Sequence, residues 1–117
     1  MQYMLMAYVN ENGWQSLPQA EREKGIAAYA AYVEALQTSG VLKGSNRLGP
    51  SAAATTVRTT NGKTQVLDGP YADTKEQLGG YFLIDVPNLD DALSWAARCP
   101  ASSHGTVEVR ALWSEPM

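Results

Sequence analysis

The chain has 117 residues, of which 44% are hydrophobic and 18% are charged, and its formal net charge is −3. This length predicts a single domain over residues 1–117, with one core that buries roughly two-thirds of the surface of the unfolded chain. The nine Lys and Arg residues are scattered singly, and no stretch of about 18 apolar residues occurs, so we expect neither a nucleic-acid partner nor a membrane span.

The first expected elements are a strand over Gln2–Val9 and a long helix. Both faces of the strand are apolar, which is typical of a central strand with helices on one side and a second subunit on the other. The helix is predicted from Ser16 to about Ser39, because Ser16 is followed by a proline in the first turn and by Gln19 three residues later. Gly40 is the expected C-terminal cap. The expected buried stripe consists of Ile26, Tyr29, Ala30, Val33 and Leu36.

A short polar strand over Leu42–Leu48 is predicted at an edge of the sheet. The segments Thr55–Thr60 and Lys63–Asp68 then flank Asn61-Gly62, the strongest short-range signal for a hairpin closed by a two-residue type I′ turn. This hairpin places Asp68 at the end of a strand.

The segment Gly80–Val86 is predicted to be a second central strand, because it too has two apolar faces. Asn88 is the expected N-cap of a second helix, and Pro100 marks the end of that helix. Its expected buried stripe is Leu89, Ala92, Leu93 and Ala96. A flexible run over Ala101–Gly105 leads to a last strand, Thr106–Trp113. The expected inward residues of this strand are Val107, Val109, Ala111 and Trp113.

This order of elements predicts an α+β fold of the ferredoxin-like type, a split β-α-β arrangement with an inserted β-hairpin and two helices on one face of an antiparallel sheet. The second face is mainly apolar. It carries Met4, Met6, Tyr8, Tyr81, Leu83 and Leu112, together with Asp85, Glu108 and Arg110. An exposed patch of this size is larger than monomers usually tolerate, so we expect a homodimer that packs through the open sheet face.

Three side chains are candidates for acid–base work. Asp68 suits a general base or an anchor for a ligand hydroxyl or amine, and the alternative is a carboxylate that caps the adjacent turn. Glu76 suits a second carboxylate near Asp68, or a loop charge paired with Lys75. His104 is the only imidazole and suits proton transfer near neutral pH, unless it is simply a solvent-exposed loop residue.

Further candidates would bind a ligand without reacting. Arg47 and Arg110 suit an anionic group held by two parallel hydrogen bonds, whereas Arg110 could instead pair with a carboxylate of the same sheet face. Tyr8, Tyr71 and Tyr81 suit an aromatic pocket, or else the core or the dimer interface.

Metal and redox chemistry are not expected. Cys99 is the only cysteine, which excludes an intramolecular disulfide and predicts a cytoplasmic protein in which Cys99 is a small buried apolar residue. With a single His and no cysteine beside it, no metal site and no cofactor are predicted.

Four motifs occur in order along the chain: Asp68-Gly69-Pro70-Tyr71, Thr74-Lys75-Glu76-Gln77-Leu78-Gly79-Gly80-Tyr81, Leu89-Asp90-Asp91-Ala92 and Val107-Glu108-Val109-Arg110. Together they resemble the YCII-related family, and within it the DGPF branch, which is named for an Asp-Gly-Pro-Phe signature. The resemblance extends from Tyr3 to Arg110 and implies a dimeric α+β-barrel protein with a cleft between sheet and loops, in a family whose members are for the most part functionally uncharacterised.

Two departures from the family pattern bear on function. Tyr71 stands where the branch usually has Phe, which adds a hydroxyl group. Better-studied members are thought to use a His on the first helix with a nearby Asp, and the predicted first helix here contains no His. The resemblance therefore does not carry that acid–base pair over to this chain.

Two functions of different classes remain open. The first is a homodimeric small-molecule-binding protein, of a non-enzymatic or regulatory kind. The second is a lyase- or isomerase-type enzyme that uses Asp68 with Tyr71 or His104 for proton transfer. The convergence of these three side chains on one pocket would favour the enzyme.

Overall fold

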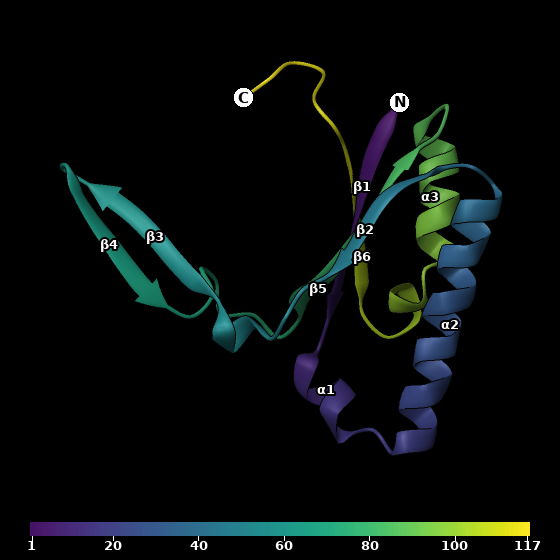
Figure 1. The fold of residues 1–117 in the computed structure, drawn as a ribbon, viewed down its shortest axis with the longest axis horizontal. Helices are drawn as coiled ribbons and strands as arrows, with labels where there is room; N and C mark the ends of the chain where they lie inside the picture. The colour runs from purple at the N-terminus through teal and green to yellow at the C-terminus, as the bar shows by residue number, and fades with distance from the viewer.

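A computed structural model describes residues 1–117. Its elements, shown in Figure 1, are β1 (Gln2–Val9), α1 (Glu11–Ser16), α2 (Gln19–Thr38), β2 (Leu42–Arg47), η1 (Ser51–Ala53), β3 (Thr55–Thr60), β4 (Lys63–Asp68), β5 (Gln77–Asp85), α3 (Leu89–Arg98), η2 (Pro100–Ser103) and β6 (Thr106–Ala111), where η marks a 3₁₀ helix.

Four strands form one sheet in the order β2-β5-β1-β6, and every neighbouring pair is antiparallel. This order is that of the split β-α-β fold, so the predicted ferredoxin-like α+β class is confirmed. Strands β3 and β4 form a separate two-stranded sheet with the predicted boundaries. The turn residues Asn61 and Gly62 have φ angles of 51° and 76°, as a type I′ turn requires, so the predicted hairpin is also confirmed.

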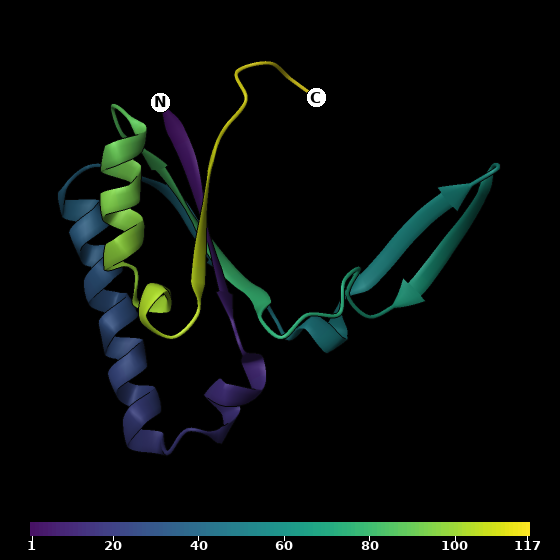
Figure 2. The same ribbon diagram turned by 180° about the vertical axis from the view of Figure 1, so that it is seen from behind.

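Helices α2 and α3 cover one face of the four-stranded sheet, as both views show (Figures 1 and 2). The core between them consists of Tyr3, Leu5, Ala7, Tyr32, Leu36, Phe82, Ile84, Val86, Ala92, Ala96, Cys99 and Ala101. Tyr32 ties the layers together: its ring meets Phe82 edge-on at 5.2 Å between centroids, and its hydroxyl donates a hydrogen bond to the Trp95 carbonyl at 2.7 Å. No helix combines the length and the apolar character needed to cross a membrane.

The predicted start of the first long helix is wrong. Residues 11–16 form a separate helix, α1, in which the Asn10 side chain accepts a hydrogen bond from the Gly13 N–H, and α2 begins after Pro18. Ser16 is the last residue of α1, and its hydroxyl donates to the Asn12 carbonyl at 2.6 Å instead of capping a helix. The C-terminal end is as expected, because Gly40 adopts a φ of +73° there.

The predicted stripe of α2 is only partly correct. Leu36 is buried, and Tyr29 and Val33 are packed against the core, whereas Ile26 and Ala30 are exposed. For Ile26 the reason is that the N-terminal half of α2 extends past the end of the sheet toward α1 (Figure 1). The residue that sequence periodicity missed is Tyr32, which is buried.

Helix α3 buries small residues and not its leucines. Ala92 and Ala96 are buried as predicted, but Leu89 and Leu93 are exposed, which corrects that part of the expectation. The alanine face lets the helix lie close to the sheet. Asn88 caps the helix through a 2.9 Å hydrogen bond from the Asp91 N–H to its side chain, as expected.

The segment after α3 is ordered, contrary to the prediction of a flexible run. Residues Pro100–Ser103 form the 3₁₀ helix η2, Ala101 is fully buried, and the Gly105 N–H donates to the Ala101 carbonyl at 2.7 Å. Strand β6 then ends at Ala111, so Trp113 is not an inward residue and is 81% exposed.

Three further strand boundaries differ from the prediction. Strand β5 begins at Gln77 and not at Gly80, and it ends at Asp85 and not at Val86. Strand β2 ends at Arg47 and not at Leu48. Gly80 pairs with Arg47 where the strands approach closely, since a side-chain Cβ at this position would lie 2.8 Å from the Asn46 carbonyl oxygen.

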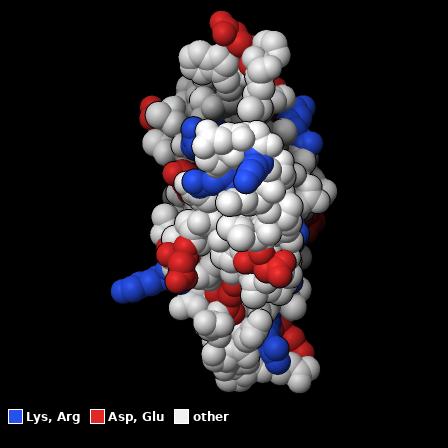
Figure 3. Space-filling model, turned by 90° about the vertical axis from the view of Figure 1, so that its left-hand side faces the viewer, with Lys and Arg blue, Asp and Glu red and all other residues white.

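The face of the sheet opposite the helices is open. Met4, Met6, Tyr81 and Leu83 are only partly buried there, and the β3–β4 hairpin projects on the same side (Figure 1). Figure 3 views the molecule from this side, where the projecting hairpin lies nearest the viewer; basic side chains lie across the middle of this view and acidic ones below them. The predicted apolar face is present in the part-exposed side chains of Met4, Met6, Tyr81 and Leu83.

Candidate functional site

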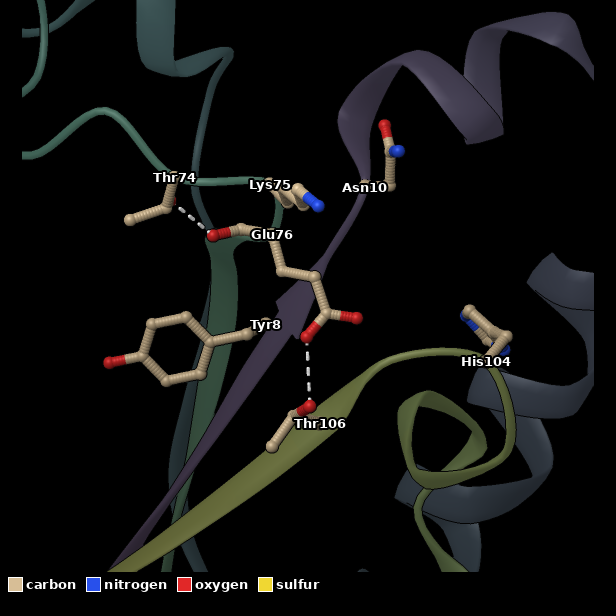
Figure 4. Close-up of a pocket in the computed structure, with 7 residues that line it drawn as sticks. All are labelled: Tyr8, Asn10, Thr74, Lys75, Glu76, His104 and Thr106. Atoms are coloured by element: carbon tan, nitrogen blue, oxygen red, sulfur yellow. Dashed lines mark hydrogen bonds between the residues drawn. The ribbon is translucent and has the colours of Figure 1, made fainter.

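A cleft of about 670 Å³ lies at one end of the four-stranded sheet. The end of β1, the start of β6 and the loop that enters β5 meet there. Its lining consists of Tyr8, Asn10, Thr74, Lys75, Glu76, His104 and Thr106 (Figure 4). This volume is within the usual range for small-molecule sites, but the cleft is wide and open to solvent, and Tyr8 is the only hydrophobic residue among the seven that line it.

Strand pairing brings these residues together from distant parts of the sequence. Tyr8 is opposite Thr106 in the β1–β6 pair and opposite Leu78 in the β1–β5 pair. The β1–β5 register shifts between Ala7 and Tyr8, so β5 carries one extra residue, Gly79, at this point. A bulge of this kind bends the strand locally and redirects side chains.

Glu76 occupies the middle of the cleft (Figure 4). Its Oε1 atom accepts a hydrogen bond from the Thr106 hydroxyl at 2.8 Å, which anchors the carboxylate while its second oxygen remains open to a ligand. Tyr8 and His104 lie on opposite sides of Glu76 in Figure 4, and Lys75 also lines the cleft. The cleft therefore presents a carboxylate, an ammonium group and an imidazole to one space.

The two aromatic members of the cleft differ in environment. The Tyr8 hydroxyl contacts Glu108 Oε1 at 3.4 Å, and partial burial, followed by the nearby Glu108 carboxylate, raises the pKa of Tyr8 above its ordinary value. Tyr8 is therefore a neutral hydrogen-bonding group at physiological pH. His104 is exposed, with Nδ1 3.4 Å from the Ser103 hydroxyl, so its ring is accessible from solvent.

The loop that carries Glu76 is fastened to α1 by Gln77. The Gln77 side chain donates to the Thr74 carbonyl at 2.6 Å and accepts from the Glu11 N–H at 3.1 Å. The Glu11 carboxylate in turn accepts hydrogen bonds from the Ser51 N–H and hydroxyl, each at 2.8 Å. These contacts hold the cleft loop, α1 and η1 in one arrangement.

Of the residues singled out from sequence, the structure brings three together in this cleft: Tyr8, Glu76 and His104. Asp68 and Tyr71 do not line the cleft. Asp68 ends β4, and its carboxylate makes no hydrogen bond within the chain. Tyr71 is 79% exposed, and the Arg58 guanidinium lies 5.8 Å from its ring centroid.

The remaining sequence candidates lie on the sheet. Tyr81 accepts a hydrogen bond from the Asn46 side chain at 2.8 Å on the open face. Arg47 ends β2, with its guanidinium 5.7 Å from the centroid of the Trp14 ring. Arg110 is on β6 opposite Met4 and makes no ion pair within the chain.

Sequence reasoning missed Asn10, Thr74, Lys75 and Thr106 as members of the cleft. A signal for Thr106 was present, because the predicted antiparallel pairing of the first and last strands places the start of one beside the end of the other, where Tyr8 lies. The structure contains no group of three or more His, Cys, Asp or Glu side chains arranged to hold a metal ion.

The fold and the cleft together define a class: a ferredoxin-like α+β protein with a polar small-molecule-sized cleft at one end of its sheet. The YCII-related domain model matches residues 1–115, so the chain belongs to the YCII-related family. A protein of Rhizobium meliloti (strain 1021), described as uncharacterised, is 38% identical over 114 residues, which are 96% of this chain and 92% of the relative.

A solved structure with a similar fold is 5-chloro-2-hydroxyhydroquinone dehydrochlorinase (TftG) from Burkholderia phenoliruptrix, in complex with 2,5-dihydroxybenzoquinone. The TM-score is 0.56 at 16% sequence identity, and the match covers 97% of this chain and 94% of that one. At this identity, the likeness shows the shared fold.

Proposed function

We propose that this protein is a homodimer that binds a small, oxygen-bearing molecule in the cleft around Glu76. The observation that carries the proposal is the convergence of Glu76, Lys75 and His104 on one space of suitable volume. The Asp68-Gly69-Pro70-Tyr71 motif supports assignment to the DGPF branch of the family, whose members are mostly uncharacterised.

The lining indicates the chemistry of the ligand. A carboxylate accepts hydrogen bonds from ligand hydroxyls, the Lys75 ammonium attracts anionic oxygens, and the His104 ring can donate or accept a hydrogen bond. The Tyr8 ring supplies an apolar surface for a flat ligand. Small hydroxylated rings and hydroxy acids have these features, and the ligand bound to TftG, 2,5-dihydroxybenzoquinone, belongs to the same chemical class.

The open sheet face supports the homodimer. Met4, Met6, Tyr81 and Leu83 form an apolar surface that a second copy would remove from water. In a two-fold dimer both copies use the same surface, so the open sheet face of one copy would pack on the open sheet face of the other. We propose a regulatory, non-enzymatic function, in which the dimer binds its ligand without converting it.

A second candidate is an enzyme of the lyase or isomerase type. It is favoured by one observation, the presence of a carboxylate and the only imidazole of the chain on the same cleft. In this chemistry one group removes a proton from the substrate and the other returns a proton. Asp68 and Tyr71 do not line the cleft, so this candidate rests on Glu76 and His104.

The test is a thermal-shift screen of small phenols, hydroxy acids and 2,5-dihydroxybenzoquinone. A ligand at 100 times its Kd stabilises the folded state by about 2.7 kcal/mol. Glu76→Gln is expected to raise the Kd roughly tenfold, since a charge-assisted hydrogen bond to the carboxylate is replaced by a weaker bond to a neutral amide oxygen. The matched control is Glu34→Gln, which makes the same change on the exposed side of α2.

Four outcomes are decisive. Equal affinity of the wild type and Glu76→Gln would remove the cleft from the proposal, whereas weaker binding by Asp68→Asn or Tyr71→Phe would move the site to the hairpin base. Conversion of a bound probe, followed by NMR and abolished by His104→Asn, would favour the enzyme. Light scattering at micromolar concentration that gave a monomer mass would refute the homodimer.

A further inference from the structure

The β3–β4 hairpin stands apart from the rest of the molecule (Figures 1 and 2). It forms its own two-stranded sheet, all six residues of β4 are exposed, and none of the twelve core residues comes from it. Two hydrogen bonds hold its base: the Gly69 N–H donates to the Ala54 carbonyl at 2.6 Å, and the Thr56 hydroxyl donates to the Gly69 carbonyl at 2.8 Å.

One face of the hairpin is apolar at its centre. Val57 and Val66 are directly opposite each other and are 62% and 64% exposed. The neighbouring pairs on this face are Thr59 with Thr64, whose hydroxyls are 3.0 Å apart, and Thr55 with Asp68. The other face carries the longer polar side chains of Arg58 and Lys63, together with Leu67, which is 57% exposed. A lone two-stranded hairpin is at best marginally stable in water, so a covering surface is expected over the valine pair.

The chain exposes more surface than a compact monomer of its mass. The accessible surface is 8295 Å², whereas a compact monomer of 12.6 kDa exposes about 6,200 Å². The radius of gyration is 16.3 Å, against about 13 Å for a compact chain of this length. The excess of roughly 2,000 Å² exceeds the ~800 Å² per partner of a standard interface and is in the range of permanent dimers.

We propose that the β3–β4 hairpin is an arm that packs its Val57–Val66 face on a second copy of this chain. The proposal rests on the proposed homodimer and deepens it. The arm projects from the side of the sheet that carries the open apolar face, so a copy seated on that face lies next to the arm (Figure 1). By two-fold symmetry each copy then receives the arm of the other, and the two surfaces form one continuous interface.

A deletion variant tests the arm directly. Because the Ala54 carbonyl and the Gly69 N–H are already hydrogen-bonded, residues 55–68 can be replaced by Asn-Gly, which closes the chain with a two-residue turn between the same partners. All core residues remain, so circular dichroism and thermal melting are expected to show a folded body. Sedimentation velocity is expected to show a dimer Kd raised at least about tenfold.

A matched pair of point variants separates the two faces of the arm. Val57→Glu and Thr60→Glu each add one carboxylate to β3, on opposite faces of the hairpin, and Thr60 is opposite Lys63. Val57→Glu is expected to raise the dimer Kd at least about tenfold, because it buries an unpaired charge. Thr60→Glu is expected to change the Kd by less than about twofold, because an exposed cross-strand ion pair contributes little.

The results distinguish the arm from the dimer. A wild-type chain that is monomeric would overturn both proposals. A wild-type dimer whose Kd is the same in the deletion variant and in Val57→Glu would overturn the arm alone, and the open sheet face would then suffice. An unchanged dimer Kd in both variants is also what we expect if the arm folds back on its own sheet or binds a different protein.

Discussion

Replacement of Gly25 by alanine tests the contact that joins α1 to α2. Gly25 lies within α2, where a glycine costs about 1 kcal/mol relative to alanine. The structure gives a reason for it: a Cβ atom at this position would lie 2.8 Å from Trp14 Cζ3 and 3.2 Å from Cη2. Trp14 of α1 therefore packs directly on the backbone of α2.

The magnitude follows from two opposing effects. Carbon atoms in contact are about 3.5–4.0 Å apart, so the Trp14 ring would have to move by roughly 0.7 Å or more. Overpacking of this kind costs typically 1–3 kcal/mol, against the gain of about 1 kcal/mol in helix propensity. Gly25→Ala is thus expected to be neutral to destabilising by about 2 kcal/mol. In a Trp14→Ala background it should stabilise by about 1 kcal/mol.

The assay is a double-mutant cycle by urea unfolding, followed by far-ultraviolet circular dichroism so that loss of Trp14 does not change the signal. All four proteins are measured at one concentration, because the stability of a dimer depends on concentration. The expected coupling energy is about 1–3 kcal/mol. A gain of about 1 kcal/mol from Gly25→Ala in both backgrounds, with coupling below about 0.5 kcal/mol, would refute the contact.

Three further expectations concern the core and the cleft. Gly105→Ala should destabilise the protein by roughly 2 kcal/mol or more in urea unfolding, because its Cβ would overlap the Tyr8 carbonyl oxygen; an unchanged midpoint would contradict this. Tyr32→Phe should cost about 1–3 kcal/mol by leaving the partly buried Trp95 carbonyl without its donor, and a loss below about 0.5 kcal/mol would argue against that bond. Burial, and then the Cys99 thiol, raises the pKa of Tyr29 from 10.0 to about 12. The neutral phenol is favoured in the folded state, so this stabilisation is complete below about pH 10 and is lost as the pH rises toward 12. Tyr29→Phe should therefore reduce the loss of stability between these pH values, and an identical alkaline profile would refute the assignment.

Several parts of the fold follow from local sequence. Asn61-Gly62 predicts the hairpin because both positions need a positive φ, which these two residues tolerate. Asn88 predicts the start of α3 because its side chain can accept a hydrogen bond from the first turn. The alternation of Tyr3, Leu5 and Ala7 predicts the buried face of β1.

Other parts depend on contacts between distant segments. Helix α1 has only six residues and is held by Trp14 on Gly25 and by the bonds of Glu11 to Ser51, so its stability is not a local property. The exposure of Ile26 has the same origin, because it depends on how far the sheet extends under α2. Periodicity identifies a helix face but not the length of the surface that covers it.

The candidate site shows the same division. Sequence alone identified Glu76 and His104 as side chains of the right chemistry, and it predicted the fold class from the order of elements. Only the tertiary structure decided that these two meet Tyr8 and Thr106 in one cleft while Asp68 and Tyr71 remain outside it. The physical reason is that short-range patterns determine helices, strands and turns, whereas a site is assembled by strand pairing across the sheet, here of β1 with β5 and β6.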